Sequence, residues 1–350
     1  MPESTPGPAR VALAGFGAWG QMHAQALAAI AGAELSAVFC HGDASAQAAQ
    51  AALPGVRLFR SYGAMLAAAG FDAVTIAVPN DLHAAFAVAA LRASFDVILE
   101  KPLGITLAEC DAVLATAAAT GRHVAVNHEL RVSHQWGQVR EIIAAGEIGR
   151  VTHQHFSLFR HPFRPGSRGW RHDKRRVGSW VLEELVHFID LVLWNARENG
   201  PPARLLAQAS SPSGLADTVS VLLTWPDGST ALVTQCLAGF QHHTLLEVAG
   251  SAGAIRTWWA GASDRTASPD FALAIRRRGE ASVEAIKVPR SGEIFELEES
   301  VRRALAGFRT GDLTMPLADA RASVALCLAI EQSIVDGGPA ELELEPCVSL

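Results

Sequence analysis

The segment with the sharpest chemical signal is Glu100-Lys101-Pro102, which directly follows the apolar run 95–99. The chain has 26 arginines but only three lysines, so a lysine here favours a role for a compact, titratable donor. At the carboxyl end of a buried parallel strand, where open α/β sheets bind ligands, its ammonium could stabilise negative charge on a reacting oxygen. A surface ion pair between Glu100 and Lys101 is the alternative.

A carboxylate and an imidazole, Glu183 and His187, lie four residues apart within the segment 179–194, whose pattern predicts a helix. Residues at this spacing share one helix face. Glu183 could therefore hold the imidazole in one tautomer and raise its basicity, which would make His187 a general base for a substrate hydroxyl. A solvated pair without a catalytic role would have the same spacing, so the spacing alone leaves both interpretations open.

A glycine-rich turn of the form G-x-G-x-x-G follows a predicted strand at 10–14 and opens a predicted helix at 18–31. In a dinucleotide-binding turn, the first glycine allows the tight bend, the second lets the backbone approach a pyrophosphate, and the third permits close packing of helix on strand. The helix N-terminus then stabilises the phosphate charge. The residues expected to bind the cofactor here are Gly15, Phe16, Gly17, Ala18, Trp19 and Gly20. An ordinary strand-to-helix turn is the alternative.

The choice between NAD and NADP depends on the end of the second strand, which reads Phe39-Cys40-His41-Gly42-Asp43. An acidic residue there binds the ribose 2′-hydroxyl of NAD, and a nearby arginine accommodates the 2′-phosphate of NADP. His41 occupies the expected position and Asp43 comes slightly late, so neither rule is met. We expect His41 to contact the cofactor. The choice stays open, with a slight preference against strict NAD specificity.

The elements that would position these residues alternate through the first 125 residues, where short β-branched runs are followed by alanine-rich segments of helical length. The strands are almost uniformly apolar, so we expect a parallel sheet with both faces covered. Expected strands are 10–14, 35–40, 73–78, 96–99 and 123–126, and expected helices are 18–31, 44–52, 82–93 and 107–120. This pattern predicts a Rossmann dinucleotide-binding domain over residues 1–128.

Beyond a helix expected at 134–145, the chain changes to longer alternating segments, which predict a mainly antiparallel sheet. Pro226-Asp227-Gly228 has the composition of a hairpin turn. Expected strands are 151–159, 203–209, 218–225, 230–236, 244–249 and 271–277, with further helices at 179–194 and 317–335. We therefore expect an α/β protein whose second domain spans residues 129–350.

Composition excludes several classes of protein. The 350 residues carry a net charge of −6 with a pI of about 6.1, which argues against a nucleic-acid partner and favours a small molecule. The five cysteines are scattered, and the histidine pairs His153 with His155 and His242 with His243 lack a third ligand, so we expect no metal. No stretch approaches the ~18 apolar residues of a membrane span, so we expect a cytoplasmic protein with no membrane partner.

Five separated stretches resemble the glucose-fructose oxidoreductase, inositol dehydrogenase and rhizopine catabolism (Gfo/Idh/MocA) oxidoreductase superfamily. They are the glycine turn with His23, Val78-Pro79-Asn80 with His83, Glu100-Lys101-Pro102, Trp170-Arg171, and Glu183 with His187. Their order and spacing cover nearly the whole chain. The resemblance implies a Rossmann domain followed by an α/β domain with a large, mainly antiparallel open sheet. It also implies a homodimer or homotetramer, because the family often assembles through that sheet.

The resemblance further implies an activity, which is NAD- or NADP-dependent hydride transfer between nicotinamide and a secondary hydroxyl or ketone of a sugar, a sugar derivative or a cyclic polyol. Lys101, His187 and Glu183 would be catalytic. Additional cofactor contacts would come from Pro79, Asn80, His83, Glu100 and Lys101, and substrate contacts from Asn127, Trp170, Arg171, Glu183 and His187. The family usually has aspartate at the position of Glu183 and glycine near Leu185, so this chain has a longer carboxylate arm and less space there.

The sequence leaves two questions open. The segment Arg160–Arg176 holds seven arginines and lysines against one acidic residue, Asp173, so it could bind a phosphorylated or carboxylated sugar or be a solvated loop. The second question is the reaction itself. The catalytic and cofactor-binding residues could instead serve redox-assisted elimination or glycoside cleavage with retained NAD. A third possibility is a non-catalytic regulator that senses a dinucleotide or a sugar.

Overall fold

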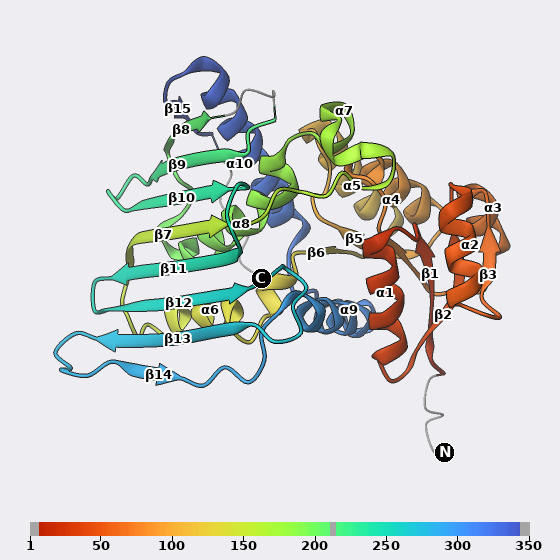
Figure 1. The fold of residues 1–350 in the computed structure, drawn as a ribbon, viewed down its shortest axis with the longest axis horizontal. Coiled ribbons are helices and arrows are strands. Elements are labelled where there is room, and N and C mark those ends of the chain that lie inside the picture. Colours follow the sequence, from red (N-terminus) through yellow and green to blue (C-terminus); the bar gives the residue numbers. More distant parts are fainter. Residues whose placement is uncertain (1–6, 211–214, 344–350) are drawn as a thin grey trace.

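The computed structural model describes residues 7–210 and 215–343, which form two sheets with helices packed on them (Figure 1). The first sheet has six parallel strands in the order β3-β2-β1-β4-β5-β6, so the expected parallel sheet is confirmed. The order reverses between β1 and β4, which opens the crevice where doubly wound sheets bind ligands. The strands are β1 (Ala9–Ala14), β2 (Ala33–Phe39), β3 (Arg57–Phe59), β4 (Ala73–Ile76), β5 (Asp96–Glu100) and β6 (Val124–Asn127).

The helices that connect these strands are α1 (Ala18–Ala29), α2 (Asp43–Ala52), α3 (Tyr62–Ala68), α4 (His83–Arg92) and α5 (Leu107–Thr120). Helix α5 has the best defined ends, because Thr106 and Glu109 form a capping box and Gly121 follows with a φ of 64°. The sequence did not predict β3 and α3, since three and seven residues are too few to show a clear period. No helix in the described ranges is both long and apolar enough to cross a membrane.

The second sheet has nine strands in the order β14-β13-β12-β11-β7-β10-β9-β8-β15. Strands β7 and β10 pair in parallel and the other described pairs are antiparallel, so the sheet is mostly antiparallel, as expected. The turn at 226–228 joins β9 to β10 as predicted. The strands are β7 (Val151–Phe159), β8 (Arg204–Ser210), β9 (Thr218–Thr224), β10 (Thr230–Cys236), β11 (His242–Gly250), β12 (Gly253–Gly261), β13 (Asp270–Arg277), β14 (Glu284–Ile286) and β15 (Ala340–Glu341). The short β14 and β15 were not expected, and neither was β12, whose apolar alternation is interrupted by glycine and arginine.

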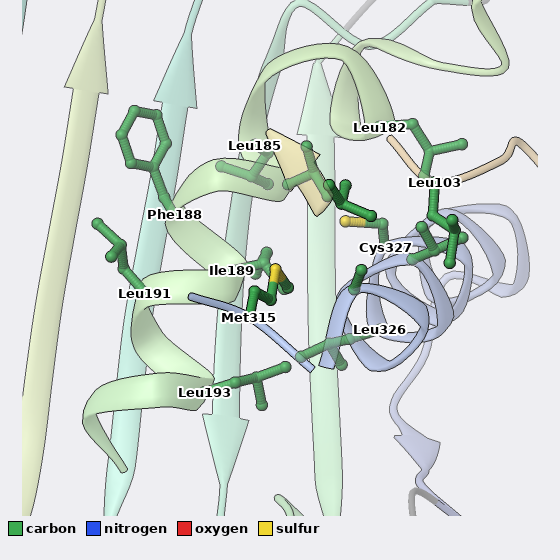
Figure 2. Packing of buried hydrophobic residues seen from close by; sticks show 14 of the residues in the cluster. Leu103, Leu182, Leu185, Phe188, Ile189, Leu191, Leu193, Met315, Leu326 and Cys327 are labelled. Carbon is green, nitrogen blue, oxygen red and sulfur yellow. The ribbon is translucent and has the colours of Figure 1, made fainter. Parts of the chain in front are cut away.

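One face of the second sheet is covered by α6 (Trp136–Ala144), α8 (Val186–Asn195) and α10 (Leu317–Asp336), and the largest buried cluster lies in this layer (Figure 1). Figure 2 shows Phe188 and Ile189 of α8 in the same cluster as Leu326 and Cys327 of α10. The predicted helix at 179–194 is present, but its first turn, Val181–Leu185, is π-helical and precedes α8. Such turns are frequent at functional sites.

Helix α9 (Glu293–Thr310) returns from the second half of the chain to the first sheet, where it packs beside α1 (Figure 1). Its side chains Leu297, Val301 and Leu305 share a buried cluster with Leu27 and Ile98. The sequence analysis missed this helix, although its apolar residues recur at helical spacing opposite a charged face. The division of the chain at residue 128 stays a prediction, and α9 is an element from beyond that point that belongs to the core of the Rossmann sheet.

Candidate active site

A cleft of about 1060 Å³ lies at the carboxyl ends of the parallel strands and is lined by residues from both halves of the chain. Most of the residues expected to bind cofactor or substrate line this cleft: Gly15, Phe16, Gly17, Ala18, Trp19, His41, Pro79, Asn80, His83, Glu100, Lys101, Trp170, Arg171, Glu183 and His187. Gly20 and Asn127, which were expected to do the same, are not part of its lining. The structure therefore brings most of the expected residues together.

The glycine turn has the shape that a pyrophosphate requires. Gly15 has a φ of +99°, and a Cβ on it would lie 2.4 Å from the carbonyl oxygen of Ala77. A Cβ on Gly20 would lie 2.2 Å from the carbonyl oxygen of Gly15, so Gly20 serves helix packing rather than ligand contact. Gly17, by contrast, faces open space, and no side chain caps the start of α1. The uncapped backbone N–H groups and the open position at Gly17 fit a phosphate.

An arginine that the sequence analysis did not consider lies beside the end of β2. Arg60, which follows β3, donates to the carbonyl oxygens of His41 and Gly42 over 2.9 and 3.0 Å and to Asp43 Oδ1 over 2.5 Å. The carboxylate and the guanidinium that would choose between the two cofactors are therefore paired with each other. Arg60 was missed because it lies 17 residues beyond Asp43 and is brought there by β3.

His83 is buried, and both of its ring nitrogens face main-chain carbonyl oxygens, Nδ1 that of Pro102 at 2.7 Å and Nε2 that of Val78 at 2.9 Å. Burial lowers the pKa of His83, although the two carbonyl groups oppose this effect. Both ring nitrogens thus face main-chain groups of the protein, and the expected contact of His83 with the cofactor stays a prediction. The imidazole holds the loop after β4 against the loop that follows Lys101.

Glu100 and Asn127 end adjacent strands, are paired in register and bond to each other. Glu100 Oε1 accepts from Asn127 Nδ2 and from His23 Nε2, each over 2.6 Å. Burial raises the pKa of Glu100, but His23 and Lys101 outweigh it and bring the pKa below its usual value. The predicted contact of Asn127 with substrate is not supported, because its amide is buried behind the cleft at 1% exposure.

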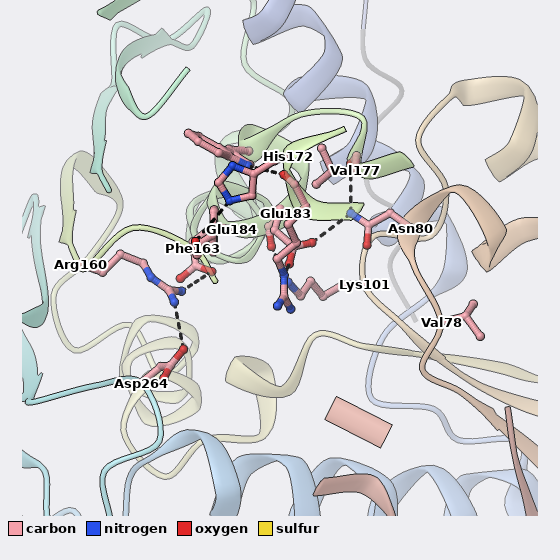
Figure 3. Close-up of polar contacts among 12 residues, drawn as sticks. Val78, Asn80, Lys101, Arg160, Phe163, His172, Val177, Glu183, Glu184 and Asp264 are labelled. Atoms are coloured by element: carbon pink, nitrogen blue, oxygen red, sulfur yellow. Dashed lines mark hydrogen bonds and ion pairs between the residues drawn. The ribbon is translucent and has the colours of Figure 1, made fainter. Parts of the chain in front are cut away.

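Lys101 follows β5 and its Nζ donates to the main-chain carbonyl of Glu183 (Figure 3). Burial alone would lower the pKa of this ammonium, but the surrounding carboxyl groups of Glu183, Glu184, Glu100 and Glu129 outweigh it and raise the pKa. Lys101 is therefore a cation at neutral pH. The structure places a partly buried positive charge in the cleft that the glycine turn also lines, where charge on a reacting oxygen could be stabilised.

The side chain of Glu183 does not contact His187, so the predicted orienting contact is wrong. Arg171 Nε donates to Glu183 Oε1 over 2.7 Å. Asn80 Nδ2 donates to Glu183 Oε2 over 3.0 Å (Figure 3). A charge-assisted bond to a guanidinium is stronger than a bond to a neutral imidazole, which explains the outcome. Burial raises the pKa of Glu183, but Lys101 and Arg171 outweigh it and lower the pKa, so the carboxylate is ionised.

His187 projects into the cleft from the first turn of α8 and is 8% exposed. Its Nε2 lies 3.8 Å from Glu129 Oε1, and its Nδ1 has no hydrogen-bond partner among the described residues. Burial, followed by the positive charge of Lys101, lowers the pKa of His187 well below its usual value. The imidazole is therefore neutral at neutral pH and can accept a proton.

Glu129 is a residue that the sequence analysis did not single out. It is 4% exposed, lines the cleft, and its Oε2 has no hydrogen-bond partner within the described ranges. Burial and the nearby Glu100 raise the pKa of Glu129 well above its usual value, although Lys101 acts in the opposite direction. Its position two residues after the last parallel strand was the one signal that could have indicated it.

Four of the seven basic residues in the segment 160–176 form ion pairs with acidic residues of the protein. Arg160 pairs with Glu184 over 2.8 Å and with Asp264 over 2.9 Å (Figure 3). Arg171 pairs with Glu183, while Arg176 and Arg175 face Asp81 and Asp173. The guanidinium of Arg171 also lies 4.9 Å from the ring of Trp170. Arg164 and Arg168 also line the cleft, so the segment keeps positive charges that an anionic substrate could meet. Across the described part of the chain, no cluster of three or more histidine, cysteine, aspartate or glutamate residues could hold a metal ion.

The strand order and the glycine turn together define a dinucleotide-binding protein whose Rossmann sheet faces a second, mostly antiparallel sheet. Residues 9–128 match the oxidoreductase family with an NAD-binding Rossmann fold. Residues 136–256 match the GFO/IDH/MocA C-terminal domain. These two matches cover more than half of the chain, which therefore belongs to the Gfo/Idh/MocA family of oxidoreductases. The resemblance found in the sequence is confirmed.

Individual relatives have related names. The inositol 2-dehydrogenase of Salmonella typhimurium (strain LT2) is 28% identical over 258 residues, which are 70% of this chain and 72% of that protein. The 1,5-anhydro-D-fructose reductase of Ensifer adhaerens is 30% identical over 190 residues, 53% of this chain and 56% of the reductase, so the match spans about half of that relative. An inositol dehydrogenase homolog from Azotobacter vinelandii, solved in complex with NAD+, has a TM-score of 0.81 and 25% identity over 96% of this chain and 98% of that one.

Proposed function

We propose that this protein is an NAD(P)-dependent dehydrogenase or reductase that transfers a hydride between nicotinamide and a secondary hydroxyl or ketone of a sugar, a sugar derivative or a cyclic polyol. One observation carries the proposal. Lys101 and His187 come from different halves of the chain, yet both line the same cleft as the glycine turn, and Lys101 is close enough to lower the pKa of His187. The names of the relatives support this class of substrate.

The dinucleotide, when bound at the glycine turn, supplies the hydride acceptor or donor. Lys101 would donate a hydrogen bond to the reacting oxygen and stabilise the negative charge that develops on it. His187, neutral because its pKa is lowered, would take the proton at Nε2 during oxidation and return it during reduction. The imidazolium that forms would lower the pKa of Glu129, whose Oε1 is 3.8 Å away, and the carboxylate produced in this way would stabilise the imidazolium.

Glu183 would act mainly through position. Its main-chain carbonyl accepts from Lys101 Nζ, and its carboxylate is fixed by Arg171 and Asn80. These bonds would hold the ammonium at a constant distance from the cofactor. Trp170 and Arg171 line the cleft as a stacked pair and would contact the substrate.

The cofactor choice follows from the Arg60–Asp43 pair. Asp43 could accept from the ribose 2′-hydroxyl of NAD, and Arg60 could instead turn to the 2′-phosphate of NADP. We propose that the enzyme accepts both dinucleotides. Comparable dissociation constants for NAD+ and NADP+ would support this assignment, and a difference of more than about 100-fold would refute it.

The uncovered face of the second sheet would form the contact between subunits of a homodimer or homotetramer. Three of its large apolar side chains, Phe159, Leu206 and Leu222, are exposed to 44%, 37% and 42%. Analytical ultracentrifugation tests this part of the proposal, since a monomer at micromolar concentration would refute it.

The activity is tested with a panel of neutral sugars, phosphorylated sugars and cyclic polyols, with each nicotinamide cofactor, by absorbance of the reduced nicotinamide. Lys101→Met should keep dinucleotide binding and reduce turnover by about 10²- to 10³-fold. Arg92→Met, an exposed change in the last turn of α4, is the matched control. Unchanged turnover in Lys101→Met would remove the lysine from the mechanism.

A further inference from the structure

The loop between β12 and β13, residues 262–269, projects from the second sheet toward α1 (Figure 1). It carries Asp264 and Arg265, and both side chains line the cleft. The guanidinium carbon of Arg265 lies 5.1 Å from the centre of the Trp19 ring. Since Trp19 lies in the first turn of α1, the second domain places a cation beside the glycine turn.

The bonding of Arg265 is incomplete. Its nearest anionic partner is Glu293, with 3.7 Å between Nε and Oε2, and neither atom has a hydrogen-bond partner among the described residues. Burial, together with the charges of Asp264 and Glu184, raises the pKa of Glu293 to about 8 against the effects of Arg265 and Arg160. The carboxyl beside Arg265 is thus mostly uncharged at neutral pH, and the guanidinium keeps its capacity to bind an anion.

The glycine turn has no cation of its own. Residues 15–23 contain neither lysine nor arginine. A pyrophosphate at Gly17 would meet only main-chain N–H groups and the helix N-terminus from the first domain. Arginine suits the missing contact, because its planar group can donate two parallel hydrogen bonds to phosphate oxygens.

We propose that Arg265 is the cationic ligand of the dinucleotide pyrophosphate, supplied across the cleft by the second domain. The proposal rests on the proposed function only as far as dinucleotide binding. Asp264, next to Arg265, is held by Arg160 over 2.9 Å, and Arg160 is held by Glu184 (Figure 3). These ion pairs fix the loop and would hold the guanidinium near the phosphates of a bound dinucleotide. Binding would then cost little conformational entropy of the loop.

Calorimetric titration of Arg265→Gln with NAD+ tests the proposal. We expect the dissociation constant to rise roughly 10- to 100-fold, because a charge-assisted bond is lost. ADP-ribose, which keeps the pyrophosphate and lacks nicotinamide, should show the same loss. Arg265→Lys should restore part of the affinity, and Glu293→Gln should leave it unchanged or increase it. The control is Arg92→Gln, which removes an exposed arginine in the last turn of α4 and should change nothing.

An unchanged dissociation constant for Arg265→Gln overturns the proposal. So does a loss seen with NAD+ but not with ADP-ribose, which would place the contact at nicotinamide. A weakened binding that Arg265→Lys does not restore, accompanied by a lower Tm, would mark a structural role and also overturn it. If the wild-type protein binds neither NAD+ nor NADP+, the proposed function itself fails, and this result is distinct from the others.

Discussion

Two buried pairs of histidine and glutamate lie near the cleft, and they differ in bonding and in charge. His23 Nε2 donates to Glu100 over 2.6 Å, and the same carboxyl oxygen accepts a second bond from Asn127. His187 and Glu129 stay 3.8 Å apart, and Glu129 Oε2 has no partner within the described residues. The pKa of Glu100 is lowered, whereas that of Glu129 is raised.

The difference shows that residue type and burial do not by themselves make a reactive group. The carboxylate of Glu100 has its hydrogen bonds made by the protein, so it is stable as an ion and holds the ends of β5 and β6 together. Glu129 and His187 have bonding capacity left over and are driven toward their uncharged forms. A pair in that condition can exchange a proton with a ligand.

The largest expected effect is that of replacing the base in the unbonded pair. His187→Asn should lower kcat/KM for polyol oxidation about 10²- to 10⁴-fold, because proton transfer to a positioned base is lost. The dissociation constant for NAD+ should not change. Steady-state kinetics and calorimetry check this, with the exposed His153→Asn as the control. Equal turnover in wild type and His187→Asn would mean that another group takes the proton.

The bonded pair should instead determine stability. Glu100→Ala leaves buried partners unpaired and should cost about 3–5 kcal/mol of unfolding free energy. Since the pKa of Glu100 is lower in the folded state, its contribution is present above its unfolded pKa and is lost as pH falls through the folded value. Urea denaturation of wild type and variant at several pH values measures both effects. If Glu129→Ala destabilises the protein as much as Glu100→Ala does, the claimed difference between the two pairs is wrong.

A smaller effect is expected at the carboxyl of the unbonded pair. The carboxyl group of Glu129 can ionise when His187 becomes an imidazolium, and removing this negative charge should lower the pKa of His187 further. In Glu129→Gln, the acidic limb of the pH–rate profile for oxidation should therefore move to lower pH, while the plateau falls by less than about tenfold. Glu34→Gln, an exposed change on β2, is the control. A limb that stays in place or moves to higher pH would show that Glu129 does not raise the pKa of the base.

The smallest effect concerns the basic segment 160–176, in which four of the seven basic residues are paired within the protein, as Glu100 is. Phosphorylated and carboxylated sugars should have at most a few-fold advantage in KM over neutral ones, in keeping with the ~0–1 kcal/mol that exposed charges contribute. Kinetics with matched neutral and anionic sugars measures this. A large preference for the anionic members would show that these arginines exchange partners when substrate binds.

The features that could be predicted from the sequence are those set by neighbouring residues. The glycine turn, the position of Lys101 at a strand end and the hairpin at 226–228 each depend on a few consecutive residues, and the structure contains all three. The alternation of strands and helices likewise predicted both sheets. A uniformly apolar run indicates a strand buried on both faces, and an alternating run indicates a strand buried on one face.

The features that could not be predicted join residues far apart in the chain. His23 and Glu100 are 77 residues apart, and Asn80 and Glu183 are 103 apart, so nothing local indicates either bond. The orienting role expected for Glu183 failed for this reason, since a helical spacing of four cannot reveal that partners from other elements take the carboxylate. Glu129 was not found from the sequence because its raised pKa depends on burial and on a carboxyl oxygen without a hydrogen-bond partner among the described residues. The sequence shows neither feature.

The central claim is that Lys101 and His187 act on one oxygen atom beside the dinucleotide. A crystal structure of the dead-end complex with NADH and a cyclic polyol that the enzyme oxidises tests it directly. The account predicts that Lys101 Nζ and His187 Nε2 both lie within hydrogen-bond distance, roughly 2.6–3.2 Å, of the same hydroxyl oxygen. A polyol that meets only one of these groups, or that binds outside the cleft, would contradict it.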